Sequence, residues 1–275
     1  MSGWATTGNA GTDSTTNFIG TADNNPLVGR VNGQQVFRFS GKMQNTIVGY
    51  QSGINNTANN NAFYGYQAGM YNTTGDGNIF FGYLTGKTNT TGRQNLFLGN
   101  YAALNNTTGS YNQFIGFQAG QYNTTGTENT FTGYQAGQSN TTGSNNYFNG
   151  MYSGSSNTTG SYNHFEGYKA GGFNTTGNDN YCSGYLAGFH NNASQNLFVG
   201  NNAGYANTTG TFNTFVGYGA GYGNNGGTNN LFIGYFAGSS NSASQNHFVG
   251  NSAGFHNTSG VHNHFDGLRL SCSSG

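Results

Sequence analysis

The sequence predicts an all-β fold, a parallel β-solenoid or β-roll built from short, nearly identical turns. A motif of the form Asn-x-x-x-Gly recurs 14 times between residues 45 and 267, and its central residue is Phe in 12 copies. Successive copies are 17 residues apart in ten steps and 16 residues apart in three. The Phe alternates with its neighbours at the period of a strand, and no helical period is visible. Self-similarity at a fixed short period is typical of solenoids, so we expect one rod of about 14 turns, trimeric or filament-forming.

The glycine that closes each motif marks the equivalent position in every turn, and we call these residues the marker glycines. The markers are Gly49, Gly65, Gly82, Gly99, Gly116, Gly133, Gly150, Gly167, Gly184, Gly200, Gly217, Gly234, Gly250 and Gly267.

Identical residues at one phase predict ladders along the axis of the rod. Parallel strands in successive turns lie about 4.8 Å apart, so equivalent side chains stack on one another. We expect an interior Phe ladder two residues before the markers, and an Asn amide ladder four residues before them, with each side chain bonded to the next. Representative members are Phe114, Phe131, Phe148 and Phe165, and Asn112, Asn129, Asn146 and Asn163.

Glycines and turn residues predict the corners of each turn. Markers such as Gly116, Gly133, Gly150 and Gly167 are expected where the backbone has positive φ or approaches closely, as is the Gly of the Ala-Gly pair that follows them. The recurring Asn-Thr-Thr-Gly is expected to close the turn, with Asn and Gly in the left-handed conformation and Thr hydroxyls bonded to loop backbone.

The residues before the array differ in pattern. Residues 27–39 resemble a hairpin around Asn32-Gly33, a pair that suits a two-residue turn. We expect residues 1–44 to cap the exposed strand edge, with a docking or assembly element as the second interpretation. Residues 17–20 (Asn-Phe-Ile-Gly) read as a degenerate first copy of the repeat. Residues 45–267 form the array and residues 268–275 a tail.

Composition excludes several classes of function. Charged residues are 5% of the chain, with seven acids and seven bases, which argues against electrostatic binding to nucleic acid. No apolar run is long enough to enter and cross a membrane, and the first residues do not resemble a secretory signal. We expect an extracellular, cell-surface or virion-surface location, with a leader already removed or delivery on a virus particle.

No catalytic constellation is visible, so the chain is not expected to be an enzyme or to need a cofactor. The acids Asp76, Glu128, Glu166, Asp179 and Asp266 share no phase, and Glu166 with Asp179 is only a weak candidate pair. Cys182 stands at a Phe position and is expected to be a buried thiol.

Two further residue sets leave alternatives open. His262 and His264 could bind a metal if three chains brought six imidazoles together, since His164, His247 and His264 share one phase; surface histidines are the simpler interpretation. Cys272, in the tail, is expected to be a free thiol, with a link between chains as the alternative.

Apolar residues at outward phases predict an interface. They occur directly before the markers (Ile115, Val216 and Ile233) and directly after them (Tyr66, Tyr83, Tyr134 and Tyr168). A stripe of this kind marks an association surface, and three copies around a threefold axis would bury it. The expected partner is therefore the chain itself, as a homotrimer or homopolymer.

The Asn-x-Phe-x-Gly-Tyr-x-Ala-Gly…Asn-Thr-Thr-Gly copies resemble head repeats of trimeric autotransporter adhesins. They are still more similar to bacterial and phage fibre proteins that end in an endosialidase-type intramolecular chaperone. The resemblance covers residues 45–267 and implies trimeric, left-handed parallel β-rolls or β-solenoids that form adhesive shafts. The repeat here is longer than the usual adhesin head repeat. No membrane anchor or chaperone domain is visible in these residues, so we interpret the chain either as an excerpt of a longer fibre or as a filament subunit of its own.

Three classes of function follow from these patterns. The leading one is a structural or adhesive fibre that makes repeated weak contacts to a host-surface glycan or protein, including a phage tail-fibre shaft or a filament of rods joined end to end. The second is an ice-binding solenoid, because Thr pairs recur in register. The third, a glycan-cleaving spike, lacks the acids it would need.

Overall fold

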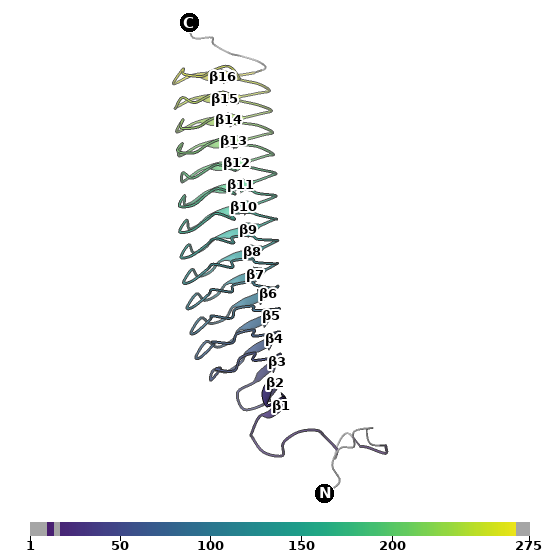
Figure 1. Cartoon of the computed structure of the whole chain (residues 1–275). Coiled ribbons are helices and arrows are strands. Elements are labelled where there is room, and N and C mark those ends of the chain that lie inside the picture. The colour runs from purple at the N-terminus through teal and green to yellow at the C-terminus, as the bar shows by residue number, and fades with distance from the viewer. Residues whose placement is uncertain (1–9, 14–16, 268–275) are drawn as a thin grey trace.

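The structure is a computed structural model that describes residues 10–13 and 17–267, and its strands form one continuous stack (Figure 1). The stack is a 16-stranded sheet in which spatial order follows sequence order. No helix occurs among the described residues, so none there could span a membrane. The strands are β1 (Leu27–Val31), β2 (Gln34–Ser40), β3 (Asn45–Val48), β4 (Ala62–Tyr64), β5 (Ile79–Phe81), β6 (Leu96–Leu98), β7 (Gln113–Ile115), β8 (Thr130–Thr132), β9 (Tyr147–Asn149), β10 (His164–Glu166), β11 (Tyr181–Ser183), β12 (Leu197–Val199), β13 (Thr214–Val216), β14 (Leu231–Ile233), β15 (His247–Val249) and β16 (His264–Asp266).

Each turn of the array contributes one short strand to this sheet. Every neighbouring pair from β3 to β16 is parallel, with equivalent residues opposite one another. The chain thus makes about 13 turns of about 17 residues, which confirms the predicted parallel solenoid. At about 4.8 Å per turn the array is roughly 60 Å long.

The Phe ladder forms the apolar interior, as predicted. Phe114 lies opposite Phe131 in the strand register, and their rings stack 4.6 Å apart at an interplanar angle of 3°. Phe148 and Phe165 continue the column, and all four side chains are 0% exposed. Ala119, three residues after a marker, is equally buried. Because a three-residue strand points only its central side chain inward, a single ring per turn fills most of the apolar core.

The predicted Asn ladder is also present, and its bonds involve the backbone. Oδ1 of Asn112 accepts the backbone N–H of Asn129 at 3.0 Å and the side-chain amide of Asn129 at 3.2 Å. Asn146 and Asn163 repeat the arrangement one and two turns further on. Nδ2 of Asn129 also donates to the carbonyl of Gly143, 2.9 Å away. Each of these asparagines therefore ties a strand to the loop of the following turn.

The Asn-Thr-Thr-Gly loop supplies a second Asn ladder that the sequence reading missed. Nδ2 of Asn123 donates to Oδ1 of Asn106, and Nδ2 of Asn140 donates to Oδ1 of Asn123, both at 2.7 Å. The Thr hydroxyls behave as expected, since Thr124 Oγ1 donates to the carbonyl of Thr141 at 3.0 Å. This second column lies inside the solenoid, and its members are completely or almost completely buried.

The expectation that Asn and Gly of this loop are left-handed is wrong. Neither Asn123 nor Gly126 has positive φ. Gly126 is needed for a different reason, because a Cβ there would lie 2.4 Å from the carbonyl oxygen of Gly143 and 2.5 Å from Oδ1 of Asn123. The loop glycine thus leaves room for the inter-turn hydrogen bonds of the second ladder.

The marker glycines combine the two expected features, a positive φ and a close approach to the backbone of the next turn. Gly116 has φ 139°, and a Cβ on it would lie 2.3 Å from the carbonyl oxygen of Gly133. Two residues later the backbone enters the left-handed region at a non-glycine, Gln118 (φ 56°), and it does so again at Glu128 (φ 57°). These two left-handed positions recur in nearly every turn and carry side chains, so they aim variable residues at the solvent.

A hairpin covers the first turn. β1 and β2 pair antiparallel around Asn32 and Gly33, both with positive φ, and β2 pairs antiparallel with β3. The guanidinium of Arg38, on β2, donates to the carbonyl of Asn56 at 3.1 Å, at the start of the second Asn ladder. Backbone groups that would otherwise form a free edge thus find partners in the hairpin.

Residues 17–20 do not form the degenerate first turn that the sequence suggested. They contain no strand, and Phe18 and Ile19 are 59% and 66% exposed. Without the Asn-Thr-Thr-Gly loop and the Ala-Gly pair, these residues lack the groups that bond one turn to the next. The tail, residues 268–275 with Cys272, lies outside the described residues.

Candidate interaction surface

The outer face of the parallel sheet is the first candidate surface. The residues on either side of the central Phe point away from the core, so each strand adds two side chains to this face. We call these positions the outer sheet face. On β4–β7 and again on β12–β15 they are mostly apolar, and the large apolar members are Tyr64, Ile79, Phe81, Leu96, Leu98, Ile115, Leu197, Val199, Val216, Leu231, Ile233 and Val249.

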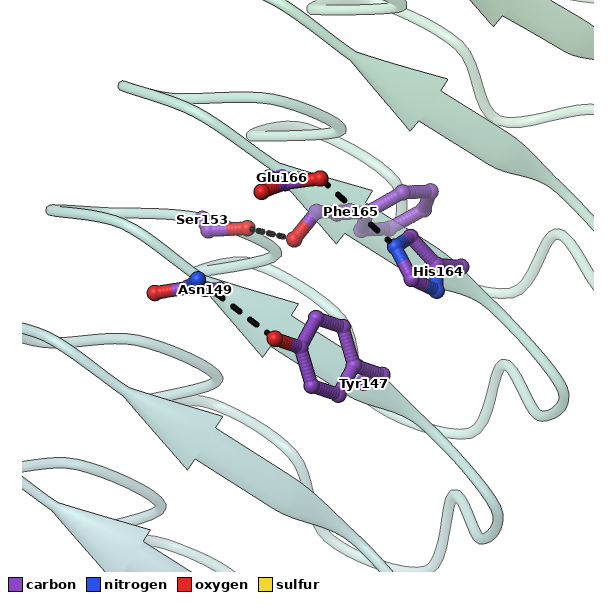
Figure 2. Close-up of polar contacts among 6 residues, drawn as sticks. All are labelled: Tyr147, Asn149, Ser153, His164, Phe165 and Glu166. Carbon is purple, nitrogen blue, oxygen red and sulfur yellow. Dashed lines mark hydrogen bonds and ion pairs between the residues drawn. The ribbon is translucent and has the colours of Figure 1, made fainter.

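A polar stretch on β8–β11 separates these two apolar regions. Figure 2 shows the part of it that lies on β9 and β10. The imidazole of His164 stacks between Tyr147 and Tyr181, with both centroid distances 4.5 Å. Nε2 of His164 lies 3.9 Å from Oε2 of Glu166. Asn149 Nδ2 donates to the Tyr147 hydroxyl at 3.4 Å in the turn before. Tyr147, Tyr181, Glu166 and Asn149 give this stretch more hydrogen-bonding groups than the flanking regions have.

An aromatic column runs beside the outer sheet face, one residue after the marker glycines in most turns and two residues after them at Tyr101 and Tyr152. Tyr66 and Tyr83 stack 5.2 Å apart, and Tyr168 stacks on Tyr185 at 5.3 Å. Tyr66 and Tyr134 are each 41% exposed. Nine rings follow one another in contact along more than half of the array: Tyr50, Tyr66, Tyr83, Tyr101, Phe117, Tyr134, Tyr152, Tyr168 and Tyr185.

The structure therefore places every residue of the predicted stripe on one continuous, partly exposed surface. Tyr66, Tyr83, Tyr134 and Tyr168 belong to the aromatic column, and Ile115, Val216 and Ile233 belong to the outer sheet face. Each of these side chains keeps part of its surface open to solvent, and Ile233 is 39% exposed. Single exposed apolar residues are ordinary, but a row that repeats along a rod is not.

A longer period, which the sequence reading missed, modulates the aromatic column. From Asn100 onward, the residue after the marker is non-aromatic at every third turn, namely at Asn100, Met151, Asn201 and Asn251. Oδ1 of Asn100 accepts a hydrogen bond from the backbone N–H of Tyr83 at 2.9 Å, so the Asn that replaces an aromatic residue here bonds to the preceding turn. Three turns span about 14 Å. This three-turn period is visible in the sequence, but it is weaker than the repeat of single turns.

The candidate catalytic and metal residues occupy different positions of the repeat. Glu166 lies on β10 and faces His164, whereas Asp179 occupies the left-handed position before β11. His247 and His264 contact each other edge to face at 4.5 Å, while His262 is in the left-handed position before β16. Over residues 10–13 and 17–267, no three His, Cys, Asp or Glu side chains gather as metal ligands would.

Cys182 is buried in the Phe column, as predicted. It lies between Phe165 and Phe198 in the strand register and is 0% exposed. Burial without a charged partner raises the pKa of the Cys182 thiol far above its usual range, because the thiolate would lose its hydration. The thiol is therefore a core side chain and is protected from reagents in solution.

The fold and surface define the chain as a repeat protein, a parallel β-solenoid with an Asn- and Phe-laddered interior and one apolar, aromatic side. Comparison with protein-family models, with curated proteins and with solved structures finds no match for the chain.

Proposed function

We propose that this chain is a non-catalytic subunit of a structural or adhesive fibre. In this proposal, rods associate through the outer sheet face and the aromatic column into a homotrimer or a homopolymer. The fibre acts outside the cell, on a cell surface or a virion surface, where exposed amides and tyrosines make repeated weak contacts with a host-surface glycan or protein. Many weak sites on one rigid body bind with high avidity.

The observation that carries this proposal is the length of the apolar surface. Half-exposed aromatic and aliphatic side chains repeat from β3 to β15 on adjoining positions. A single solenoid with one Phe per turn buries little apolar area, and association would add burial along the whole array. The three-turn period also supports polymer formation, since a neighbouring copy displaced by three turns meets a closely similar pattern.

Molar mass from light scattering on a sizing column tests the proposal. We expect three times 29.0 kDa for a trimer, or a larger and polydisperse mass for a filament. Replacing Ile115 and Val216 together by Lys should lower the mass while leaving the circular dichroism spectrum unchanged, since both side chains point outward. The matched control replaces the exposed Thr125 and Thr142 by Lys and should keep the mass of the original protein. A monomer at micromolar concentration would contradict the proposal.

An ice-binding function is the second candidate, favoured by one column of hydroxyls. The second Thr of the loop is exposed in seven consecutive turns: Thr74, Thr91, Thr108, Thr125, Thr142, Thr159 and Thr176. The hydroxyl of the first Thr is already hydrogen-bonded to the next turn, as in Thr124, which donates to the carbonyl of Thr141. Only one regular hydroxyl column therefore faces water. Thermal hysteresis is the direct measurement, and its absence in the monomeric variant would retire this candidate.

A further inference from the structure

The second Asn ladder lacks one inter-turn hydrogen bond in the described part of the chain, between Asn174 and Asn191. These residues are consecutive members of the second Asn ladder, yet Nδ2 of Asn191 donates to the carbonyl of Ala193 at 3.2 Å instead of to Asn174. Oδ1 of Asn174, in a side chain that is 0% exposed, has no hydrogen-bond partner. The loop that follows is one residue shorter, and Cys182 replaces Phe in the same region. The same short loop occurs in two other turns, where the ladder bond is kept, so the missing bond is the local departure here. Departures from a pattern that is otherwise maintained are expected where a function demands them.

A pocket lies beside this interruption, on segments that connect the strands. It measures 340 Å³ and is lined by Tyr152, Ser155, Tyr168, Lys169, Gly172, Phe173 and Phe189. Gly172 leaves space between larger neighbours, because a Cβ there would come within 2.9 Å of the Phe189 ring. Phe173 is 50% exposed, and Phe189 meets it edge to face at 4.7 Å. We call this depression the Lys169 pocket.

Lys169 places one positive charge among aromatic rings. Its Nζ lies 5.3 Å from the ring centre of Tyr168, 5.6 Å from that of Tyr152 and 5.9 Å from that of Phe189. No carboxylate forms an ion pair with this ammonium in the described part of the chain, where the one recorded pair is His164–Glu166. The ammonium can donate up to three hydrogen bonds, and the rings hold its stem in place.

We propose that the Lys169 pocket binds an acidic saccharide, a sugar ring that carries a carboxylate. The carboxylate would accept hydrogen bonds from Lys169, and the apolar C–H face of the sugar would lie on Phe173 or on the neighbouring rings. Sugar hydroxyls would meet the hydroxyls of Tyr152, Ser155 and Tyr168, which line the pocket. A few aromatic walls with one convergent charge are the usual composition of a small-ligand site. This inference rests on the adhesive part of the proposed function and is independent of self-association.

A tri-galacturonate oligomer and its fully methyl-esterified form are a matched pair of probes, because esterification removes the charges and leaves the sugar rings and their hydroxyls unchanged, adding only a methyl group to each carboxyl. Binding is measured by saturation-transfer NMR on the full chain at concentrations up to about 10 mM. We expect the acid to bind at least about fivefold more tightly than the ester, as one partly exposed charge-assisted contact allows. Added salt should reduce that difference.

Two variants locate the site. Lys169→Gln should abolish the preference for the acid, while Phe173→Ala should weaken both oligomers. Lys87→Gln is the control, because Nζ of Lys87 lies 6.0 Å from the centre of a single ring, that of Tyr71. This substitution should leave the binding of both oligomers unchanged. Equal binding of acid and ester, unchanged binding by Lys169→Gln, or equally tight binding of benzoate would overturn the proposal.

The molar mass of the same samples separates this inference from the fibre proposal. Assembly without preference for the acid would reject the saccharide site alone. Binding by a monomer would keep the site and reject the fibre. A change of mass in Lys169→Gln, without a change in binding, would reassign the pocket to contacts between copies and overturn the inference.

Discussion

Asn140 donates its side-chain amide to Oδ1 of Asn123 in the previous turn at 2.7 Å and to the carbonyl of Gly143 in its own loop at 3.0 Å. All three groups are buried, so no water can replace the donor. The amide thus fixes both the shape of its loop and the distance to the neighbouring turn.

Replacing Asn140 by Ala should therefore destabilise the protein by about 2–4 kcal/mol, because Oδ1 of Asn123 loses its donor and the buried amide of Asn157 loses an acceptor. The free energy of unfolding in urea measures the effect. Thr142→Ala, at an exposed position two residues later, should change it by less than about 0.5 kcal/mol. Equal effects of the two substitutions would show that the ladder contributes little to stability.

The Phe column should be similarly sensitive. Phe148 stacks at 4.8 Å on Phe131 and at 4.9 Å on Phe165, and Phe148→Ala would leave a gap that neighbouring turns cannot close. We expect a loss of about 3–5 kcal/mol. Phe212→Ala is a matched control, since that ring is 54% exposed, and it should cost much less. An unchanged melting temperature for Phe148→Ala would be incompatible with an interior ladder.

A marker glycine should not tolerate a side chain. In Gly116→Ala the new Cβ would lie 2.3 Å from the carbonyl oxygen of Gly133, at a φ of 139° that is strained for alanine. We expect a loss of several kcal/mol or failure to fold, seen as a lower melting temperature or insoluble protein. Gly41→Ala is the control, because nothing lies within 4 Å of a Cβ at that position. Normal stability of the Gly116 variant would contradict the close approach of the two turns.

Stability should respond to alkaline pH through Cys182. The folded state raises the pKa of this thiol, while the unfolded chain ionises near its usual value of 9.0. Below about pH 8 the thiol is neutral in both states and contributes no pH dependence. Above pH 9 the unfolded chain alone releases the proton, so the free energy of unfolding should fall by up to about 1.4 kcal/mol per pH unit.

Urea unfolding between pH 8 and 10.5 checks this expectation. Cys182→Ala should have a lower free energy of unfolding at every pH, but that free energy should fall less steeply with pH than in the original protein. Cys272→Ala should show the same dependence on pH as the original protein. Identical slopes for all three proteins would mean that the thiol ionises in the folded state.

The repeat was enough to establish the fold, because each turn must satisfy the same packing and hydrogen-bonding requirements as the next. Phe two residues before each marker could lie only in the interior of so thin a solenoid, and the marker glycines could lie only at corners. The predicted stripe of Tyr66, Tyr134 and Ile233 followed from the same periodicity, since alternate strand residues point outward. Repetition within one chain thus provided the information that a single copy would lack.

The partners of the loop groups were decided only in three dimensions. Asn123 and Gly126 have the composition of a left-handed turn, yet the carbonyl of Gly143 and the amide of Asn140 in the next turn determine their conformation. The Lys169 pocket joins residues from three turns. The repeat brings Ser155, Gly172 and Phe189 to one phase, but only the structure shows the depression that Gly172 leaves between its larger neighbours. The conformational preferences of its residues determine the backbone path of a single turn. Which side chains and backbone groups hydrogen-bond to one another is determined by the contacts between turns, because every buried donor and acceptor needs a partner and finds it in a neighbouring turn.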